Sequence, residues 1–448
     1  MTTAIAKRGP LADAPRIEPL RARFLSAASW SLAGAVASRG LTLVGSILAA
    51  RLLGTAAFGA LGIVQCTAGM FVAVAGLGLG LTATKHVAEC RDSHPDRAGR
   101  LIGLLVMVTA VSGLVLSLLF ALSIDVLAWT IPDGRALAGE LRLATGLVFF
   151  GALNGTLLGI LAGFEAFRSS ANVGVVRGGL GAALMLAGMS ARGVPGGVAG
   201  LVVAEAIAAL ATCAAVGREA RAKGVRVGWP VVWAEWPVLW RFGLPALLSS
   251  VAILPVMWAG NVLLVRWGGG FDQVGLFAAA GRWGQLILFL PSSISGIVLP
   301  MLANSHGSRD RARFRSLFNL NVVVNLAVTV PPLAALALLA RPAMRLYGED
   351  YERGWPIVIA LALGALPTVL NNVLGQAVIS AGSIWCRVAI DLLLAAMLAA
   401  GALWLVPRHG AVGLAIAHGL AYSASSLVLL WLSWRQVWRV RHARPFLA

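Results

Sequence analysis

The sequence predicts an all-α integral membrane protein with about twelve transmembrane helices, arranged as two parallel six-helix lobes around a central cleft. Three observations support this fold class: a low content of charged residues, many apolar stretches of membrane-spanning length, and an internal repeat. Only 12% of the 448 residues are charged and 59% are hydrophobic, whereas a soluble domain has about 25% charged residues. This composition excludes an ordinary water-soluble enzyme.

Twelve stretches are apolar enough to cross the hydrocarbon core, which takes about 20 residues of helix. They lie at about residues 26–50, 57–81, 101–123, 143–164, 172–191, 196–216, 242–265, 273–300, 317–340, 355–380, 387–406 and 411–434. The longest polar connection is too short to form a soluble domain. The predicted organisation is therefore an N-terminal arm (1–25), an N-lobe (26–216), a linker (217–241), a C-lobe (242–434) and a basic tail (435–448).

The distribution of Lys and Arg predicts the orientation of the chain. If the N-terminus lies inside, the cytoplasmic segments hold 24 of the 36 basic residues and the outside segments hold nine. Because cytoplasmic loops of membrane proteins are enriched in Lys and Arg, both termini and the linker are expected in the cytoplasm. The net charge of +18 is thus mostly explained by topology, and it does not indicate a nucleic-acid partner.

Four tryptophans predict an interfacial helix within the cytoplasmic linker. They are Trp229, Trp233, Trp236 and Trp240. Their spacing places them on one face of a helix, as is typical of helices that lie in the plane of the membrane surface. We therefore expect this segment to be anchored at the cytoplasmic interface.

An internal repeat divides the chain into two halves. Residues 197–205 resemble residues 410–418 at an offset of 213, and residues 51–54 resemble residues 266–269 at an offset of 215. Each half contains an even number of spans, so the two halves have the same orientation and are related by an axis along the membrane normal. Two parallel lobes around a cleft are typical of transporters that work by alternating access.

Three arginines within the spans are candidate anion ligands, because a charge inside the bilayer costs at least about 3 kcal/mol and usually faces a polar interior. Arg39 lies about 20 Å along the helix from either end of its span, so it is predicted to face a wet cavity. The alternative is a buried pair with Glu205 or a backbone carbonyl. Arg282 lies in the cleft or at the outer interface, and Arg177 either faces the cavity or extends to the cytoplasmic surface.

Two acidic residues within the spans are candidate ion-coupling groups. Glu205 lies in the middle of a span, where it either takes up a proton or neutralises an arginine. Asp391 occupies the repeat position of Arg177, at an offset of 214, and forms either a salt bridge or a coupling site. The sequence contains no GxSxG, HExxH or Walker motif, so we expect no catalytic residue, metal site or cofactor.

Four short strings identify a family resemblance. They are residues 50–59 (ARLLGTAAFG), residues 274–280 (VGLFAAA), Leu299–Pro300, and residues 346–351 (LYGEDY). They resemble the turn between the first two spans, the beginning and end of span 8, and the loop before span 10 of one family. The chain resembles polysaccharide or oligosaccharide-lipid flippases, the O-antigen and exopolysaccharide translocases of the multidrug/oligosaccharidyl-lipid/polysaccharide exporter superfamily.

The resemblance implies a bacterial inner-membrane protein with two six-helix lobes around a cleft. The implied substrate is a polyprenyl-pyrophosphate lipid that carries a short sugar chain and moves from the cytoplasmic to the outer leaflet. Membrane lipids, a polysaccharide polymerase and export machinery are the other implied partners. In similar proteins, arginines on spans 1 and 8 line the cleft, and Arg39 and Arg282 lie on those spans here.

Three alternative functions remain open. A multidrug exporter of the same superfamily would need acidic residues deep in the cleft, but the first span contains Arg39 and no acid. A membrane polysaccharide polymerase or ligase would carry a large basic outside loop, but the longest outside segment, residues 124–142, contains only Arg135 and Arg142. The sequence does not distinguish a transporter from a scaffold or regulator that has kept the transporter fold.

Overall fold

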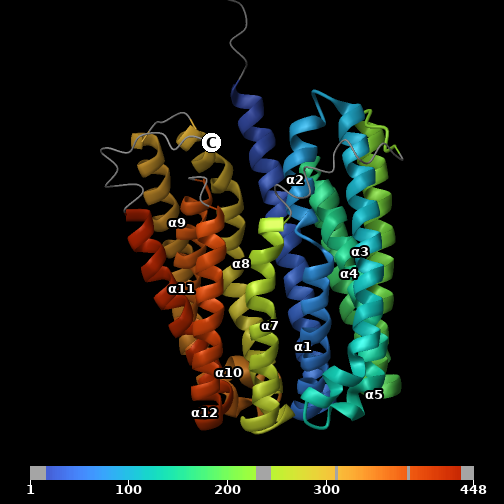
Figure 1. Ribbon diagram of the computed structural model, residues 1–448, viewed down its shortest axis with the longest axis vertical. Helices are drawn as coiled ribbons and strands as arrows, with labels where there is room; N and C mark the ends of the chain where they lie inside the picture. The colour runs from blue at the N-terminus through green and yellow to red at the C-terminus, as the bar shows by residue number, and fades with distance from the viewer. Residues whose placement is uncertain (1–16, 229–243, 308–310, 381–383, 435–448) are drawn as a thin grey trace, which may run out of the picture.

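The computed structural model describes residues 17–228, 244–307, 311–380 and 384–434, and the regular elements in these segments are all helices (Figure 1). Eight of the described helices are long and apolar enough to cross a membrane, and a shorter apolar helix covers Val251–Trp267. The prediction of an all-helical protein that crosses the membrane several times is confirmed.

The helices follow one another along the chain with short connections. The first half of the chain forms α1 (Ile17–Ala75), α2 (Leu79–Cys90), α3 (Pro95–Thr130), α4 (Ala138–Gly163) and α5 (Phe167–Ala222). The second half forms α7 (Leu244–Trp267), α8 (Phe271–Gly307), α9 (Arg311–Leu338), α10 (Ala340–Arg345), α11 (Trp355–Ser380) and α12 (Ile384–Trp434). Short 3-10 helices precede α4 at Gly134–Leu137 and α11 at Glu349–Gly354.

Three of the helices, α1, α5 and α12, are of double length and contain a non-helical glycine. These glycines are Gly54 (φ 75°), Gly193 (φ 60°) and Gly410 (φ 55°). Glycine adopts positive φ without the steric cost that a Cβ atom imposes, so the chain can change direction there. In α5 the two limbs pack against each other, since a Cβ atom on Gly188 would lie only 2.0 Å from the carbonyl oxygen of Gly196.

Some boundaries differ from the sequence prediction. The predicted span 57–81 is interrupted by a turn at residues 76–78, where Leu77 and Gly78 have positive φ. Because the leucines around this turn are apolar, the hydropathy of the sequence does not indicate the turn. The first helix begins at Ile17, inside the predicted arm, and α5 continues to Ala222, inside the predicted linker.

Other predicted segments lie outside the described residues. The tryptophans of the proposed interfacial helix fall in residues 229–243, and the basic tail covers residues 435–448. Residues 1–16 of the N-terminal arm are also outside the described part of the chain.

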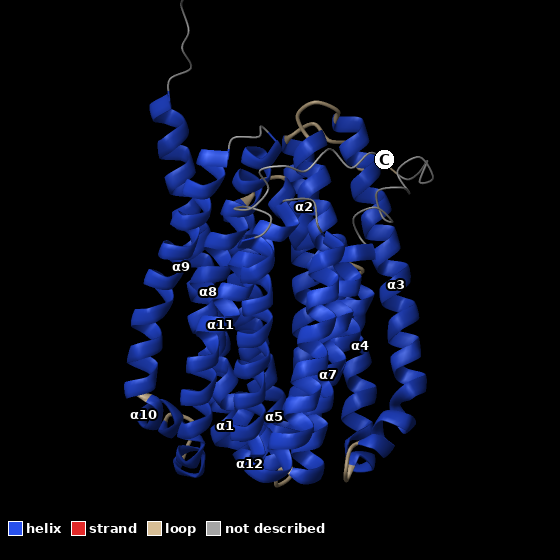
Figure 2. Cartoon of the chain, turned by 60° about the vertical axis from the view of Figure 1, so that its left-hand side comes forward, coloured by secondary structure: helices blue, strands red, loops and turns tan. Residues whose placement is uncertain are grey.

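The two halves of the chain form two helical bundles that lie side by side (Figures 1 and 2). Helices α1, α7 and α8 meet between the bundles, and one cluster of buried apolar side chains contains members from both. Phe58 and Ile63 of α1 pack in this cluster with Leu264 of α7, Leu276 of α8 and Tyr347. This packing holds the halves together at the end of the molecule that contains Gly54.

Candidate substrate-binding site

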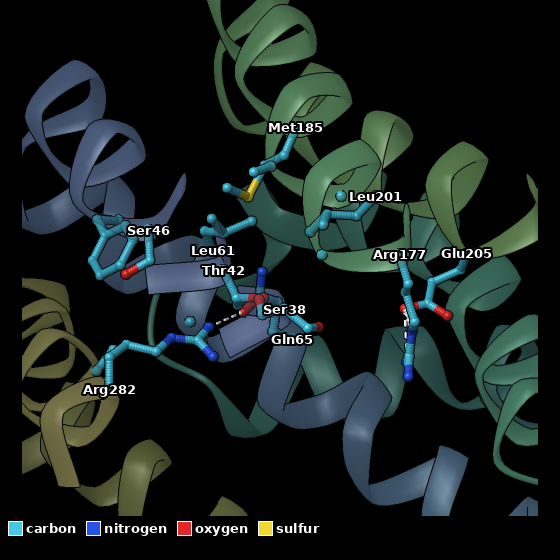
Figure 3. Close-up of a pocket in the computed structure, with 16 residues that line it drawn as sticks. Ser38, Thr42, Ser46, Leu61, Gln65, Arg177, Met185, Leu201, Glu205 and Arg282 are labelled. Carbon is cyan, nitrogen blue, oxygen red and sulfur yellow. Dashed lines mark hydrogen bonds and ion pairs between the residues drawn. The ribbon is translucent and has the colours of Figure 1, made fainter. Parts of the chain in front are cut away.

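A cavity of about 360 Å3 lies between α1, α5 and α8 (Figure 3). Its polar lining consists of Ser38, Thr42, Ser46, Gln65, Arg177, Glu205 and Arg282. A second space of about 280 Å3 shares part of this lining, including Arg177 and Glu205. The structure thus brings two of the predicted arginines and one predicted acid into one polar space.

Helix geometry explains how the cavity acquires its hydroxyl groups. Ser38, Thr42 and Ser46 are spaced by four residues on the first limb of α1, so they lie on one face of the helix. Gln65 reaches the same space from the second limb. The facing part of α5 carries small residues, and a Cβ atom on Gly178 would lie 2.7 Å from the carbonyl oxygen of Ser38. The two helices therefore approach closely beside the cavity.

Arg282 is half-buried at the cavity wall, on the α8 side. Its Nη2 donates a hydrogen bond to Oε1 of Gln65 at 3.0 Å (Figure 3). Gln65 is neutral, and Arg282 forms no salt bridge with a carboxylate in the described part of the chain. Arg282 consequently offers a full positive charge to a ligand in the cavity.

Arg177 is instead neutralised by Glu205. The Nε and Nη2 atoms of Arg177 both lie 2.8 Å from Oε1 of Glu205 (Figure 3). The other carboxylate oxygen, Oε2, accepts a hydrogen bond from Nδ2 of Asn154 at 2.7 Å. The Arg177 side chain is 39% exposed and the Glu205 side chain 18% exposed, so the pair can be reached from the cavity. Glu205 therefore pairs with Arg177 and not with Arg39.

Arg39 does not line this cavity. Its side chain is exposed, and its guanidinium carbon lies 4.6 Å from the centre of the Phe289 ring on α8. A guanidinium over an aromatic face gains a favourable cation–π interaction. Arg39 thus contacts the second half of the chain near the edge of the cavity, because the adjacent Ser38 belongs to its lining.

Asp391 lies away from the cavity, in the second half of the chain. It is 2% exposed and forms an ion pair with Arg387 one turn earlier on α12, with Nη2 and Oδ1 2.8 Å apart. Nη1 of Arg387 also donates to the carbonyl oxygen of Asn371 at 3.1 Å. Of the two functions considered for Asp391, the structure shows the salt bridge.

Sequence reasoning did not single out Gln65 or the hydroxyl row on α1. The row has a detectable signal, namely polar residues at a spacing of four within an otherwise apolar span. Gln65 carries no charge, and a single amide within an apolar span gives no comparable signal in the sequence.

The cavity is closed at the end of the molecule that contains Gly54. Oη of Tyr347 lies 3.2 Å from Oγ of Ser46, and Oη of Tyr351 donates to the carbonyl oxygen of Gly54 at 3.0 Å. Nε of Arg51 donates to the carbonyl oxygen of Leu346 at 2.7 Å. The contacts of Tyr351 and Arg51 join residues 50–59 to residues 346–351, two of the strings that identify the family resemblance. We call this set of contacts the Gly54-end closure.

The backbones of the two halves also touch at this closure. A Cβ atom on Gly59 would lie 1.9 Å from the carbonyl oxygen of Phe271, and one on Gly275 would lie 2.1 Å from that of Thr55. The hydroxyl of Thr55 donates to the carboxylate of Asp272. Glycine is required at both positions because any side chain would push the halves apart.

Comparison with known proteins identifies the family of the chain. The family model described as polysaccharide biosynthesis protein matches residues 24–306, and the model described as lipid II flippase MurJ matches residues 281–447. The EPS I polysaccharide export inner membrane protein EpsE of Ralstonia nicotianae is 28% identical over 425 residues, which is 91% of this chain and 93% of that protein. The lipid III flippase of Escherichia coli is 24% identical over 358 residues, covering 78% of this chain and 83% of that one.

Solved structures show the same fold. An inward-facing multidrug resistance MATE family transporter of the MOP superfamily has a TM-score of 0.74 at 14% identity, over 89% of this chain and 94% of that one. The inward closed conformation of the lipid II flippase MurJ has a TM-score of 0.71 at 15% identity, over 90% and 87% of the two chains. The chain belongs to the polysaccharide biosynthesis protein family, a family of transporters and flippases and not of enzymes, and it shares its fold with the solved MOP superfamily transporters.

Proposed function

We propose that the protein is an inner-membrane flippase that moves a polyprenyl-pyrophosphate-linked oligosaccharide from the cytoplasmic to the outer leaflet, for assembly of surface O-antigen or exopolysaccharide. The observation that carries this proposal is the positive charge of Arg282, held by neutral Gln65 at the wall of a hydroxyl-lined cavity. The names of the similar proteins, a polysaccharide export protein and a lipid III flippase, support the substrate class.

The chemistry of the cavity suits both polar parts of such a lipid. Pyrophosphate is the most costly part to move through hydrocarbon, and arginine binds phosphate oxygens with a permanent charge and a two-pronged donor. The hydroxyls of the α1 row and the amide of Gln65 suit sugar hydroxyls. The prenyl chain stays in the bilayer. Arg39, at the edge of the cavity, and Arg177, within it, are the two further proposed anion ligands.

The proposed transport mechanism is alternating access between two six-helix lobes. If α1, α5 and α12 each cross twice and α7 crosses once, the described helices provide twelve crossings. The bias of basic residues favours both termini in the cytoplasm, which puts the Gly54-end closure on the outer side. The cavity then opens toward the cytoplasm in this conformation.

Of the two ion-coupling candidates, Glu205 is the stronger. Glu205 lines the substrate cavity. Asp391 is buried against Arg387 and is not among the residues that line the cavity. A polysaccharide polymerase and export machinery are proposed as partners that take up the flipped substrate.

The rival function of multidrug export would use a free acidic group for cationic drugs. The carboxylate in the cavity is paired with Arg177, and the unpaired charge there is the cation Arg282. Among the described residues, the charges of the cavity therefore favour an anionic substrate.

Replacing Arg282 by alanine tests the proposal. We expect Arg282→Ala to abolish surface polysaccharide without lowering the abundance of the protein in the membrane, because a charge-assisted hydrogen bond contributes about 1.5–3 kcal/mol to ligand binding. Arg282→Lys keeps the charge but loses the two-pronged geometry, so an intermediate level of export is expected. The measurement is cell-surface polysaccharide, normalised to the membrane content of the protein.

A matched control is Arg135→Ala. Arg135 lies in the connection between α3 and α4 and stacks on Trp129, near the end of α3. Export should be normal in this control. Normal export by Arg282→Ala would overturn the assignment of the cavity.

A further inference from the structure

Two of the three charges in the cavity cancel each other. Arg177 and Glu205 both line it, and both guanidinium contacts at 2.8 Å are made to the same oxygen, Oε1 of Glu205. Arg282 is the third charge. The side chains that line the cavity therefore carry a net charge of about +1, although two of them are arginines.

The two oxygens of Glu205 have different partners. Oε1 faces Arg177, and Oε2 is held by Nδ2 of Asn154 at 2.7 Å, while the same nitrogen donates to the backbone carbonyl of Glu205 at 3.0 Å. Asn154 is 1% exposed, and the hydroxyl of Thr212 donates to its Oδ1 at 3.4 Å. Because the Asn154 amide is a donor to Oε2, a proton on the carboxyl group belongs on Oε1, the oxygen that faces Arg177.

We propose that Glu205 determines whether Arg177 is available to bind the substrate, by taking up or losing a proton. When Glu205 is ionised, it occupies the guanidinium of Arg177. When Oε1 takes up a proton, Arg177 is released to bind the second phosphate of an anionic pyrophosphate lipid whose first phosphate contacts Arg282. Asn154 is a positioning residue that keeps Oε2 in place in both states. This inference rests on the proposed function, since it requires an anionic substrate.

The surroundings of Glu205 support a one-proton switch. The first limb of α5 contributes Arg177 and α8 contributes Arg282, while α4 contributes the neutral Asn154 and α1 the neutral Gln65. Among the described residues that line the two spaces, Glu205 is the only acidic one. Proton uptake and anion binding therefore favour each other, and by linkage the ligand binds more tightly at lower pH.

The switch is compatible with outward transport. A pyrophosphate diester carries two negative charges, so the lipid together with one proton moves a net charge of −1. An inside-negative membrane potential favours the outward movement of that charge. When the lipid is released at the outer side, Glu205 loses its proton to that side and pairs again with Arg177. The protein without lipid then returns to the conformation open to the cytoplasm with the Arg177–Glu205 ion pair formed.

Binding of farnesyl pyrophosphate to the purified full-length protein in lipid nanodiscs tests the switch. Calorimetry at several pH values, in two buffers with different ionisation enthalpies, counts the protons taken up with each ligand. On binding the ligand, the wild type should take up at most about one extra proton. Its affinity for the ligand should rise by at most about tenfold for each unit by which the pH falls. Glu205→Gln should bind at pH 8 at least as tightly as the wild type does at pH 6, with no extra uptake.

Because the probe itself ionises, the decisive quantity is the ratio of wild-type to Glu205→Gln affinity at each pH. The control Glu219→Gln removes a carboxylate of the same helix that is bonded to Ser169 outside the cavity, and it should keep the wild-type pH dependence. Proton uptake with farnesyl pyrophosphate alone supports the switch with a lipid ligand, and uptake with inorganic pyrophosphate as well supports it with the pyrophosphate group as the ligand.

The outcomes separate this inference from the proposed function. A wild-type to Glu205→Gln ratio that does not change with pH overturns the switch, even if binding still depends on Arg282. Absence of binding at every pH, or binding that is unchanged in Arg282→Ala, overturns the substrate cavity itself and the switch with it.

Discussion

Three arginines within apolar helices are stabilised in three different ways. Arg282 contacts a neutral amide, Arg177 contacts a carboxylate, and Arg39 lies over an aromatic ring. The sequence alone identifies these residues, because a charge stands out in an apolar span. It does not identify their partners, since Gln65 is 217 positions from Arg282 and the Arg177–Glu205 pair forms only when the two limbs of α5 come together.

Replacing Arg39 by alanine separates a role in transport from a role in folding. The loss of one cation–π contact with Phe289 costs about 0.5–1 kcal/mol at an exposed site, so the membrane content should not change. Surface polysaccharide should be lost, because a proposed anion ligand at the cavity edge is removed. Arg39→Lys should restore part of the export. Wild-type polysaccharide levels in Arg39→Ala cells would remove Arg39 from the proposed site.

At the scale of the helices, the positions of turns depend on backbone conformation as well as on hydropathy. The sequence separates spans 172–191 and 196–216, and the structure breaks α5 between them at Gly193. The turn at residues 76–78 was not predicted, because its residues are apolar or glycine and do not interrupt the apolar stretch. Where a turn lacks charged residues, hydropathy gives the number of apolar stretches better than their ends.

Gly193→Ala tests the importance of the α5 turn. Gly193 has φ 60° and ψ −142°, and nothing lies within 4 Å of an added Cβ atom, so the only cost is backbone strain. Such strain costs about 1–3 kcal/mol, and we expect a lower thermal unfolding temperature in detergent. Gly139→Ala, in α4, also has open space but a negative φ, and it should not lower that temperature. Equal stability of the two variants would show that the Gly193 conformation is not strained for alanine.

At the scale of the whole molecule, the two halves meet at the Gly54-end closure, and the cavity lies beside it. Ser46 belongs to the cavity lining and also contacts Tyr347 of the closure. The sequence predicts two related halves and contains the strings that form the closure. It does not show that residues 50–59 and 346–351 touch, because that contact depends on how the halves are packed in this conformation.

Tyr347→Phe tests whether the closure controls access from outside. The variant keeps the packed ring and loses the bond to Ser46, which contributes about 1 kcal/mol, so outer opening should become roughly fivefold more frequent. The measurement is labelling of the half-buried Cys66 by an impermeant maleimide on whole cells, after the exposed Cys213 and Cys386 are replaced by serine. Tyr422→Phe, in α12, should leave labelling unchanged. Equal labelling of Tyr347→Phe and the parent would argue against this role.

The first limb of α1 belongs to two functional parts at once. It carries the hydroxyl row of the cavity, and eight residues after Ser46 it ends at the Gly54 turn, where the halves are joined. Since an α-helix rises about 1.5 Å per residue, both parts are fixed to one stiff rod within roughly 12 Å. A substitution that shifts this rod to admit a different sugar also shifts the turn. Substrate range and the balance between the two conformations are therefore expected to change together in relatives that carry different glycans.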